Sequence, residues 1–452
     1  MGLSYFFNHE YNKYMTNLLY ARVLMGLSLG FHIIFAYLGV GIPLFISLAE
    51  IIGIIKKNDN FLIFAKRASY ALVILFAVGA ASGTLVAFEL SLLWPPFMSL
   101  ISKVDILPFA LEGIAFVVEA IFLGIYIYRW DKFKNRILHW LSSIPIVIGA
   151  FASAALITSV NAFMNTPAGF SIVNGKIINI KPIKALMNPI SFSEIFHVVS
   201  SAYLATALTI SLIYAYYIIK GKKEKYYKSI LNFSMVLVLI FSLLTGFSGD
   251  LQGKSIAQFN PEKLAATEGV FHTNLGVSER IGGIFSNNHL LYAIKIPYLL
   301  SFLAYGAPNA KVLGLYSFPK SSWPPLFIHY AFDFMVIMGT IYAGYSLLYV
   351  FILFFKKKRI LLYNKINLYI LMLLGASAFL VVEAGWISAE VGRYPWIIYH
   401  VMRIKDAITA SPDVGFIFYL MLFTFIFLFF MMIFLLLNFY KKRPIYRDGK
   451  IT

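Results

Sequence analysis

The apolar stretch Leu24–Leu48, LMGLSLGFHIIFAYLGVGIPLFISL, decides the class of fold. An α-helix needs roughly 20 mostly apolar residues to cross a bilayer, and this stretch exceeds that length. Its apolar residues are continuous rather than alternating, which excludes a membrane β-strand. The residues up to Tyr20 lack the apolar core of a cleavable signal peptide, so we expect the stretch to remain as the first membrane helix.

Apolar runs of the same kind recur along the rest of the chain. The predicted spans lie near residues 21–49, 68–94, 106–129, 138–163, 192–219, 229–249, 325–355, 363–390 and 412–438. The sequence therefore predicts an all-α, polytopic membrane protein with about nine transmembrane helices.

The composition supports this class and excludes others. Of the 452 residues, 60% are hydrophobic and 13% are charged, whereas soluble domains carry about 25% charged residues. A water-soluble protein and a disordered chain are therefore excluded. Because the chain has no cysteine, disulfides, iron–sulfur clusters, thiolate ligands and covalently attached haem c are excluded as well. His, Met and carboxylate side chains remain as possible ligands for a metal or a haem.

The net charge of +18 comes from short basic clusters between the apolar runs. The clusters follow alternate spans and contain Lys56, Lys57, Lys66, Arg67; Arg129, Lys132, Lys134, Arg136; Lys220, Lys222, Lys223, Lys225; Lys356, Lys357, Lys358, Arg359; and Lys441, Lys442, Arg443. Basic residues stay on the cytoplasmic side, so we expect an outside N-terminus and an inside C-terminus. The clusters are interpreted as topology signals, and no nucleic-acid partner is expected.

One connection is too long to be a turn. Between spans six and seven, residues 250–323 are expected to form a loop on the outer face, and connections of this length are usually functional. We therefore divide the chain into residues 1–249 with six helices, the loop 250–323, and residues 324–452 with three helices.

Ionisable side chains at membrane depth are costly and usually functional. Glu112 and Glu119 are two helical turns apart and share one stripe of the third span. They could ligate iron, pass protons along the helix, or form hydrogen bonds between packed helices. His32 and His197 lie on apolar spans, where imidazole either ligates haem or makes an ordinary hydrogen bond. Met335 by itself would be a packing residue.

Two further groups have an ordinary and a functional interpretation. Trp386, Glu390 and Arg393 share a face at the end of the eighth span; an interfacial anchor accounts for the Trp and the Arg but not for the Glu. In the long loop, Lys263 and Glu268 flank a short helical stretch. They could hold and deprotonate a polar headgroup such as a quinol, or belong to a solvated loop helix.

Several motifs, in order along nearly the whole chain, resemble subunit I of the cytochrome bd quinol oxidases. GWISAEVGRYPW at 385–396 is similar to the family signature GWxxxExGRQPW, with Tyr394 in place of Gln. GDLQGK at 249–254 and PEKLAATE at 261–268 resemble the start of the family's quinol-binding loop. LEG at 111–113, NAFMNTP at 161–167, FP at 318–319 and PP at 324–325 agree as well.

The resemblance implies a set of haem ligands. His197 and Met335 would be the axial ligands of a low-spin haem b near the outer surface. His32 and Glu112 would serve two high-spin haems, one a haem b and the other a haem d or a haem b in its place. Which residue serves which high-spin haem is left open.

The resemblance also implies roles for the other candidates. Glu119 would lie on the proton route from the cytoplasm, Glu390 and Arg393 would hold the haem pair or its propionates, and Trp386 could sit between haems. Lys263 and Glu268 would meet the quinol.

The implied protein is an electrogenic quinol:oxygen oxidoreductase in a prokaryotic plasma membrane, working with a second membrane subunit and in some cases a small single-span subunit. Two alternatives stay open: a quinone-reactive haem protein that does not reduce oxygen, and a haem-free proton-coupled transporter.

Besides Tyr394, the chain departs from the family pattern at several places, which include the end of the second span, where AFELS stands at 87–91 in place of an EFQFG-like sequence. Asp333 stands where a basic residue is usual, two positions before the low-spin Met ligand. The two carboxylates of the third span are seven rather than eight residues apart. Ala150 replaces a Ser of the fourth span. The sequence therefore indicates a divergent branch of the superfamily.

Overall fold

The structure is a computed structural model that describes residues 2–222, 224–409, 414–442, 446–447 and 450–451. Its α-helices are α1 Gly2–Ile55, α2 Asp59–Leu93, α3 Pro95–Val104, α4 Leu107–Tyr128, α5 Arg136–Leu141, α6 Ile144–Asn165, α7 Pro182–Leu186, α8 Ser191–Ile219, α9 Lys225–Phe259, α10 Pro261–Thr267, α11 Leu299–Tyr305, α12 Ile328–Phe354, α13 Lys365–Glu390 and α14 Val414–Lys442. Short 3-10 helices are η1 Leu315–Ser317, η2 Lys320–Ser322, η3 Lys356–Tyr363, η4 Val391–Arg393 and η5 Ile404–Asp406.

Strands in the described part of the chain form only two-stranded antiparallel hairpins or pairs. They are β1 Ser171–Val173 with β2 Lys176–Ile178, β3 Asn274–Leu275 with β8 Lys311–Val312, β4 Glu279–Ile281 with β7 Ile294–Ile296, β5 Ile284–Ser286 with β6 His289–Leu291, β9 Trp396–Ile398 with β10 Met402–Arg403, and β11 Tyr446–Arg447 with β12 Lys450–Ile451. The β1–β2 hairpin turns at Asn174-Gly175, both with positive φ, as a two-residue hairpin turn requires.

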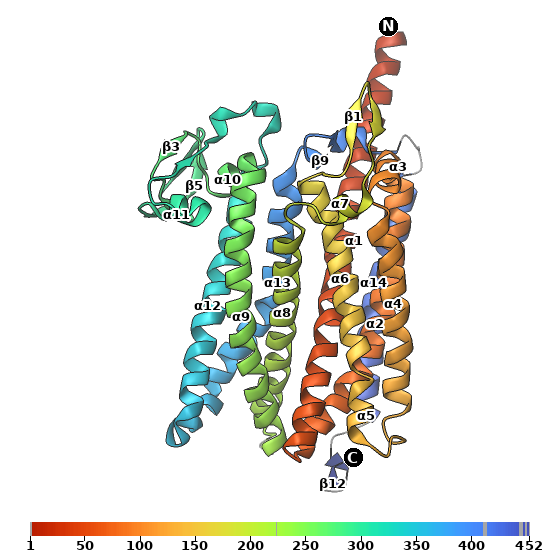
Figure 1. The fold of residues 1–452 in the computed structure, drawn as a ribbon, viewed down its shortest axis with the longest axis vertical. Coiled ribbons are helices and arrows are strands. Elements are labelled where there is room, and N and C mark those ends of the chain that lie inside the picture. The colour runs from red at the N-terminus through yellow and green to blue at the C-terminus, as the bar shows by residue number, and fades with distance from the viewer. Residues whose placement is uncertain (1, 223, 410–413, 443–445, 448–449, 452) are drawn as a thin grey trace. The chain divides into compact units, whose positions relative to one another are not determined.

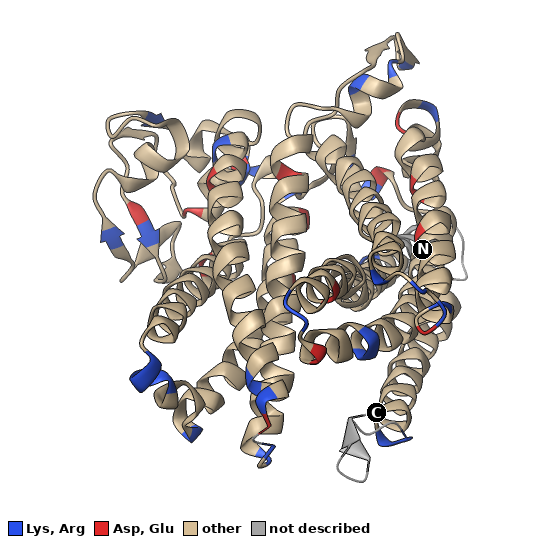
Figure 2. Ribbon diagram, turned by 60° about the horizontal axis from the view of Figure 1, so that its bottom comes forward, with Lys and Arg blue, Asp and Glu red and all other residues tan. Residues whose placement is uncertain are grey.

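The prediction of nine membrane helices is confirmed for the described residues. Helices long and apolar enough to cross a membrane cover Met15–Ile55, Asp59–Leu93, Leu107–Tyr128, Arg136–Asn165, Ser191–Ile219, Lys225–Phe259, Ile328–Phe354, Lys365–Arg393 and Val414–Lys442. Lys223, Arg443 and residues 412–413 of the predicted ninth span lie outside the described residues. Figure 2 shows the Lys and Arg positions, in blue along the ribbon, mainly at the ends of the helices.

The chain divides into two compact units. The first comprises residues 1–101, 118–147 and 405–452. In it, α1 and α2 pack along each other and α14 packs against both. Helix α1 is 54 residues long, because the chain before the first apolar run continues the same helix.

The second unit comprises residues 102–117 and 148–404. Helices α8, α9, α12 and α13 form a ring in which α8 and α12 each pack against both α9 and α13 (Figure 1). Helix α9 continues to Phe259, so the first ten residues of the predicted loop are helical. The remainder of the loop folds on its own buried apolar cluster, which includes Leu264, Val270, Leu300 and Val312.

A buried acid lies between α3 and α4. Asp105 is fully shielded from solvent, and its two carboxylate oxygens have no hydrogen-bond partner among the described residues. Burial raises the pKa of Asp105 from 3.8 to about 7. Between these two pH values the folded protein binds more protons than the unfolded chain, so the stability that Asp105 contributes falls as the pH rises to about 7.

We expect Asp105→Asn to remove this pH dependence, because an amide has no charge to bury. At about pH 8 the variant should melt about 2–4 °C above the parent protein, and the difference should shrink towards about pH 5. Thermal unfolding of the detergent-solubilised protein at the two pH values measures this. An equal difference at both pH values would contradict a titrating Asp105.

Candidate functional site

The His197 ring on α8 is held by a hydroxyl group on α9. Nδ1 lies 3.2 Å from Ser248 Oγ. The Ser248 hydroxyl donates its own proton to the Thr245 carbonyl at 3.1 Å, so its oxygen accepts from Nδ1–H. This bond fixes the tautomer and leaves the Nε2 lone pair available to a metal.

The same arrangement occurs at His32 on α1. Its Nδ1 lies 3.0 Å from Ser82 Oγ on α2, and the Ser82 hydroxyl donates to the Gly79 carbonyl at 3.0 Å. Gly83 lies against the ring, since a Cβ there would be 3.0 Å from His32 Cε1. The hydrogen bond uses only Nδ1, so it is compatible with metal ligation by Nε2 rather than an alternative to it.

Met335 and His197 lie on α12 and α8, the two helices that share α9 and α13 as neighbours. Met335 is seven residues from the start of α12, and His197 is six residues from the start of α8. Each therefore lies about 10 Å along its helix axis from the helix start. A Cβ on Gly249 would lie 3.4 Å from His197 Cε1, and one on Gly385 would lie 3.0 Å from Met335 Sδ. Glycine at these positions gives both side chains room against the neighbouring backbone.

The two acids of α4 have different surroundings. Glu112 is half-buried and accepts a hydrogen bond from the Ser153 hydroxyl of α6 at 2.9 Å. Glu119 is buried. Ser153 lies one turn after Ala150, so α6 supplies a hydroxyl to this carboxylate although the expected Ser is missing.

Glu390 and Arg393 form an ion pair at the end of α13, in which the Arg393 side chain is buried and the Glu390 side chain is 30% exposed. Arg393 Nη2 lies 2.7 Å from Glu390 Oε2, and the Asn161 amide of α6 donates to Glu390 Oε1. Arg393 is only 4% exposed, which contradicts an interfacial anchor that reaches for headgroups. Its Nε and Nη1 have no hydrogen-bond partner among the described residues, so the guanidinium can still bind an anion.

Helix α10 is buried, so the interpretation of a solvated loop helix is wrong. Lys263 is 5% exposed and Glu268 is 3% exposed. Lys263 Nζ donates to the Ala389 carbonyl at 3.0 Å. Burial lowers the pKa of Lys263 from 10.5 to about 8, and the Glu194 carboxylate opposes that change. The Lys263 side chain lies against Gly392, since a Cβ there would be 2.8 Å from Lys263 Cε.

Glu268 belongs to a second group of charges. Burial raises the pKa of Glu268 well above its usual value, and the neighbouring Glu279 carboxyl raises it further, while Arg280 acts in the opposite direction. Because Lys263 and Glu268 are five residues apart, they are about 140° apart around a helix. The two residues therefore face different partners.

The acid in the position that is usually basic has a local partner. Asp333 Oδ2 accepts from the Gly282 backbone N–H at 2.5 Å and lies 3.4 Å from His329 Nε2. The His329 nitrogens also contact the Thr267 carbonyl at 2.6 Å and the Gly282 carbonyl at 3.0 Å. Because carbonyls only accept, both ring nitrogens of His329 face hydrogen-bond acceptors. An imidazole therefore lies one helical turn before Asp333 and in contact with it.

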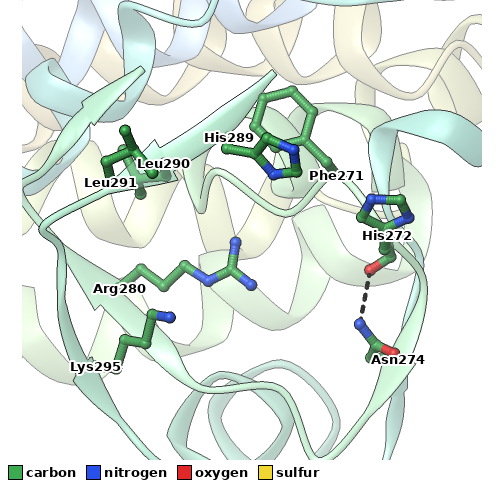
Figure 3. A pocket seen from close by; sticks show the side chains of 8 residues that line it. All are labelled: Phe271, His272, Asn274, Arg280, His289, Leu290, Leu291 and Lys295. Atoms are coloured by element: carbon green, nitrogen blue, oxygen red, sulfur yellow. Dashed lines mark hydrogen bonds between the residues drawn. The ribbon is translucent and has the colours of Figure 1, made fainter. Parts of the chain in front are cut away.

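A cavity of about 290 Å³ lies in the loop beside Glu268. Its lining residues are Phe271, His272, Asn274, Arg280, His289, Leu290, Leu291 and Lys295. Figure 3 shows the Arg280 guanidinium pointing into it, and Arg280 Nη1 also donates to the Gly269 carbonyl at 2.5 Å. The cavity therefore combines apolar side chains with basic and imidazole groups, and one of these basic groups, Arg280, interacts electrostatically with the buried Glu268.

The donor set fits haem better than a bare metal ion. Among the described residues, no three His, Cys, Asp or Glu side chains come together to hold an ion. A haem needs only one or two axial protein ligands. That need is met by two imidazoles with fixed tautomers, by a thioether on α12, which lies across the four-helix ring from His197 on α8, and by a buried Arg with unpaired donors.

Sequence reasoning missed the residues that support these groups. Ser82, Ser248 and Ser153 are ordinary residues of apolar helices, and their partners lie on other helices. His329 was overlooked, although its spacing of four residues from Asp333 was a usable signal.

The fold and the site define a polytopic membrane protein whose half-buried His and Met side chains suit haem. The model of the family described as "Cytochrome bd terminal oxidase subunit I" matches residues 20–444. The chain belongs to the cytochrome bd oxidase subunit I family. Members of this family are haem-binding oxidases, and the chain is a multi-pass protein of the prokaryotic plasma membrane.

Three relatives illustrate the similarity. A Bacillus subtilis (strain 168) protein, provisionally named cytochrome bd menaquinol oxidase subunit I, is 39% identical over 96% of this chain and 99% of its own length. Cytochrome bd ubiquinol oxidase subunit 1 of the same organism is 28% identical over 89% of this chain and 88% of its own length. The structure of bd oxidase from Geobacillus thermodenitrificans superposes with a TM-score of 0.90 at 39% identity, covering 95% of this chain and 99% of that one.

Proposed function

We propose that the chain is the haem-bearing subunit of an electrogenic quinol:oxygen oxidoreductase. The observation that carries the proposal is the shared arrangement at His32 and His197. In both, a serine hydroxyl fixes Nδ1–H and presents Nε2 as a ligand.

His197 and Met335 would hold a low-spin haem b. His32 and Glu112 would serve the two high-spin haems, one a haem b and the other a haem d or haem b. When bound, the haems carry electrons from the quinol site to the place where oxygen is reduced to water. Glu390 and Arg393 would hold propionates, and Trp386 would lie between haems.

Glu268 would accept a proton from the quinol, with Lys263 and the adjacent cavity as further contacts. The long loop would be outside, together with the N-terminus, and the C-terminus inside, as the basic clusters indicate. Glu119 would pass protons from the cytoplasm. Electrons and protons then enter from opposite faces, so charge is separated without a pump.

The functional assembly would include a second membrane subunit and bound lipid, and in some forms a small single-span subunit. Quinol and oxygen are the substrates. His329 and Ser153 compensate for the departures at Asp333 and Ala150, which favours an oxygen-reducing enzyme over a quinone-reactive protein that leaves oxygen intact.

The test is oxygen uptake by the purified complex with a reduced naphthoquinol and a reduced benzoquinol, together with a pyridine haemochrome count. We expect haem and quinol-dependent uptake. Haem without uptake would favour the quinone-reactive alternative, and purified protein without a haem spectrum would favour the transporter.

A further inference from the structure

Three buried titratable side chains meet in the unit that contains His32. Glu50 on α1, Tyr126 on α4 and His139 on α5 are all fully shielded from solvent. The Tyr126 hydroxyl donates to Glu50 Oε2 at 2.7 Å. Glu50 Oε1 lies 2.5 Å from His139 Nδ1. The Glu50 carboxyl group of α1 is therefore in contact with both α4 and α5, which are distant from α1 in the sequence.

The hydrogen-bond donors and acceptors around Glu50 and His139 leave one proton for the two groups to share. His139 Nε2 lies 2.9 Å from the Tyr126 carbonyl. That oxygen only accepts, so Nε2 carries a hydrogen and Nδ1 is the variable nitrogen. The proton of the short contact sits either on the imidazole or on the carboxyl. The pair is neutral overall in both forms, which limits the cost of burial.

The surroundings shield the pair on one side and supply charges on the other. The Trp130 and Phe133 rings lie 4.7 and 5.5 Å from the His139 ring, centroid to centroid. The charged groups near this end are Arg136, which donates to the Trp130 carbonyl at 2.9 Å, and Lys66, which pairs with Asp131 at 3.0 Å. These groups belong to the basic clusters that mark the cytoplasmic side in the proposed orientation.

Two helices lead from the cluster to residues with proposed roles. Tyr126 follows Glu119 by seven residues on α4, so both lie on one face about 10 Å apart along the axis. On α1, Glu50 follows His32 by eighteen residues, which is five full turns on one face. The cluster therefore stands at the end of the stripe that carries the buried Glu119.

Building on the proposed function, we propose that Glu50 and His139 form a proton relay at the cytoplasmic end of the route to Glu119. The pair releases its shared proton through the Tyr126 hydroxyl and water to the Glu119 carboxylate. This leaves a neutral imidazole and a Glu50 carboxylate that still accepts the Tyr126 hydrogen bond. One proton from the cytoplasm then restores the pair, and only bonds to hydrogen change.

The variant Glu50→Gln, measured in the complete complex, distinguishes a proton relay from a cluster that only holds the helices together. The amide oxygen can still accept from Tyr126 and the amide N–H can donate to Nδ1 of a neutral His139, so the contacts remain but the exchangeable proton is lost. We expect proton uptake and oxygen uptake to slow by about 10- to 100-fold. Haem content and haem reduction by quinol should not change, and the infrared bands of the Glu50 carboxyl group, in either protonation state, should disappear.

Ser47→Ala is the matched control, because Ser47 is a buried neighbour on α1 that accepts from the Ser143 hydroxyl at 2.8 Å and holds no titratable proton. It should behave as the parent protein. Parental rates across about pH 6–8 and an unchanged infrared spectrum in Glu50→Gln would overturn the relay. If that variant fails to assemble with haem, Tyr126→Phe takes its place. Tyr126→Phe should slow proton and oxygen uptake several-fold and change the dependence of the rate on pH. A pH dependence like that of the parent protein would also overturn the relay.

The two proposals fail in distinguishable ways. A parent complex that takes up no oxygen refutes the proposed function. Infrared spectra of the Glu50 carboxyl group, recorded at a series of pH values, need no enzyme turnover. They therefore still report whether Glu50 exchanges a proton.

Discussion

His197→Ala should abolish the low-spin haem and lower quinol-dependent oxygen uptake at least about 100-fold. Even changes to residues that merely orient a metal ligand cost about 10- to 100-fold in affinity or activity, and this substitution removes the proposed ligand itself. The Nδ1 contact to Ser248 at 3.2 Å leaves Nε2 as the nitrogen that could bind iron. Haem content and the reduced-minus-oxidised spectrum of the purified complex measure the loss.

Ser248→Ala provides the graded control for this prediction. It keeps the imidazole but removes the acceptor that fixes Nδ1–H, so haem affinity should fall by about 10- to 100-fold while the axial ligation pattern remains. The His32 site should keep its own haem in both variants, because Ser82 fixes that ring separately. A full haem complement and an unchanged spectrum in His197→Ala would remove His197 from the ligand set.

The membrane helices could be predicted from the sequence because each is a local, continuous apolar run. The predicted and observed ends differ by a few residues at most helices. The exceptions are the long α1, the start of α2 at Asp59 and the extension of α9 to Phe259. In all three, polar residues continue a helix beyond the apolar stretch, which hydropathy alone does not detect.

The contacts of the site could be predicted only in part. Motifs singled out Glu390 and Arg393, which the structure pairs at 2.7 Å. Local patterns gave no sign of the Glu50–His139 contact, because 89 residues separate its partners. The burial of α10 was missed for a similar reason, since its cover comes from segments elsewhere in the sequence.

The pairing of Asp333 with His329 shows a further limit. Taken by itself, the acid at position 333 in place of a base was only a departure from the family pattern. The structure places an imidazole one turn earlier, in contact with that acid. A departure from a family pattern is therefore best judged together with the residues one turn away on the same helix.

Arg393→Gln should lose haem even though no iron ligand is changed. Arg393 uses Nη2 for Glu390, while Nε and Nη1 are buried without a partner among the described residues. Two unpaired donors of a buried guanidinium are costly unless an anion binds them, and a haem propionate is the anion that the proposed function supplies. We expect haem content to fall by half or more and oxygen uptake by about 100-fold.

Arg393→Lys and Glu390→Gln are the matched variants for this test. Lysine keeps the charge but lacks the planar fork that binds a carboxylate with two hydrogen bonds, so it should recover only part of the haem. Glu390→Gln keeps the Asn161 contact and leaves Arg393 to the propionate, so it should retain more haem than Arg393→Gln. If Arg393 served only to neutralise Glu390, the double variant Glu390→Gln/Arg393→Gln would regain its haem. If Arg393 binds the haem, the double variant stays as deficient as Arg393→Gln, and this is the result we expect, because removing the acid does not replace the lost donors.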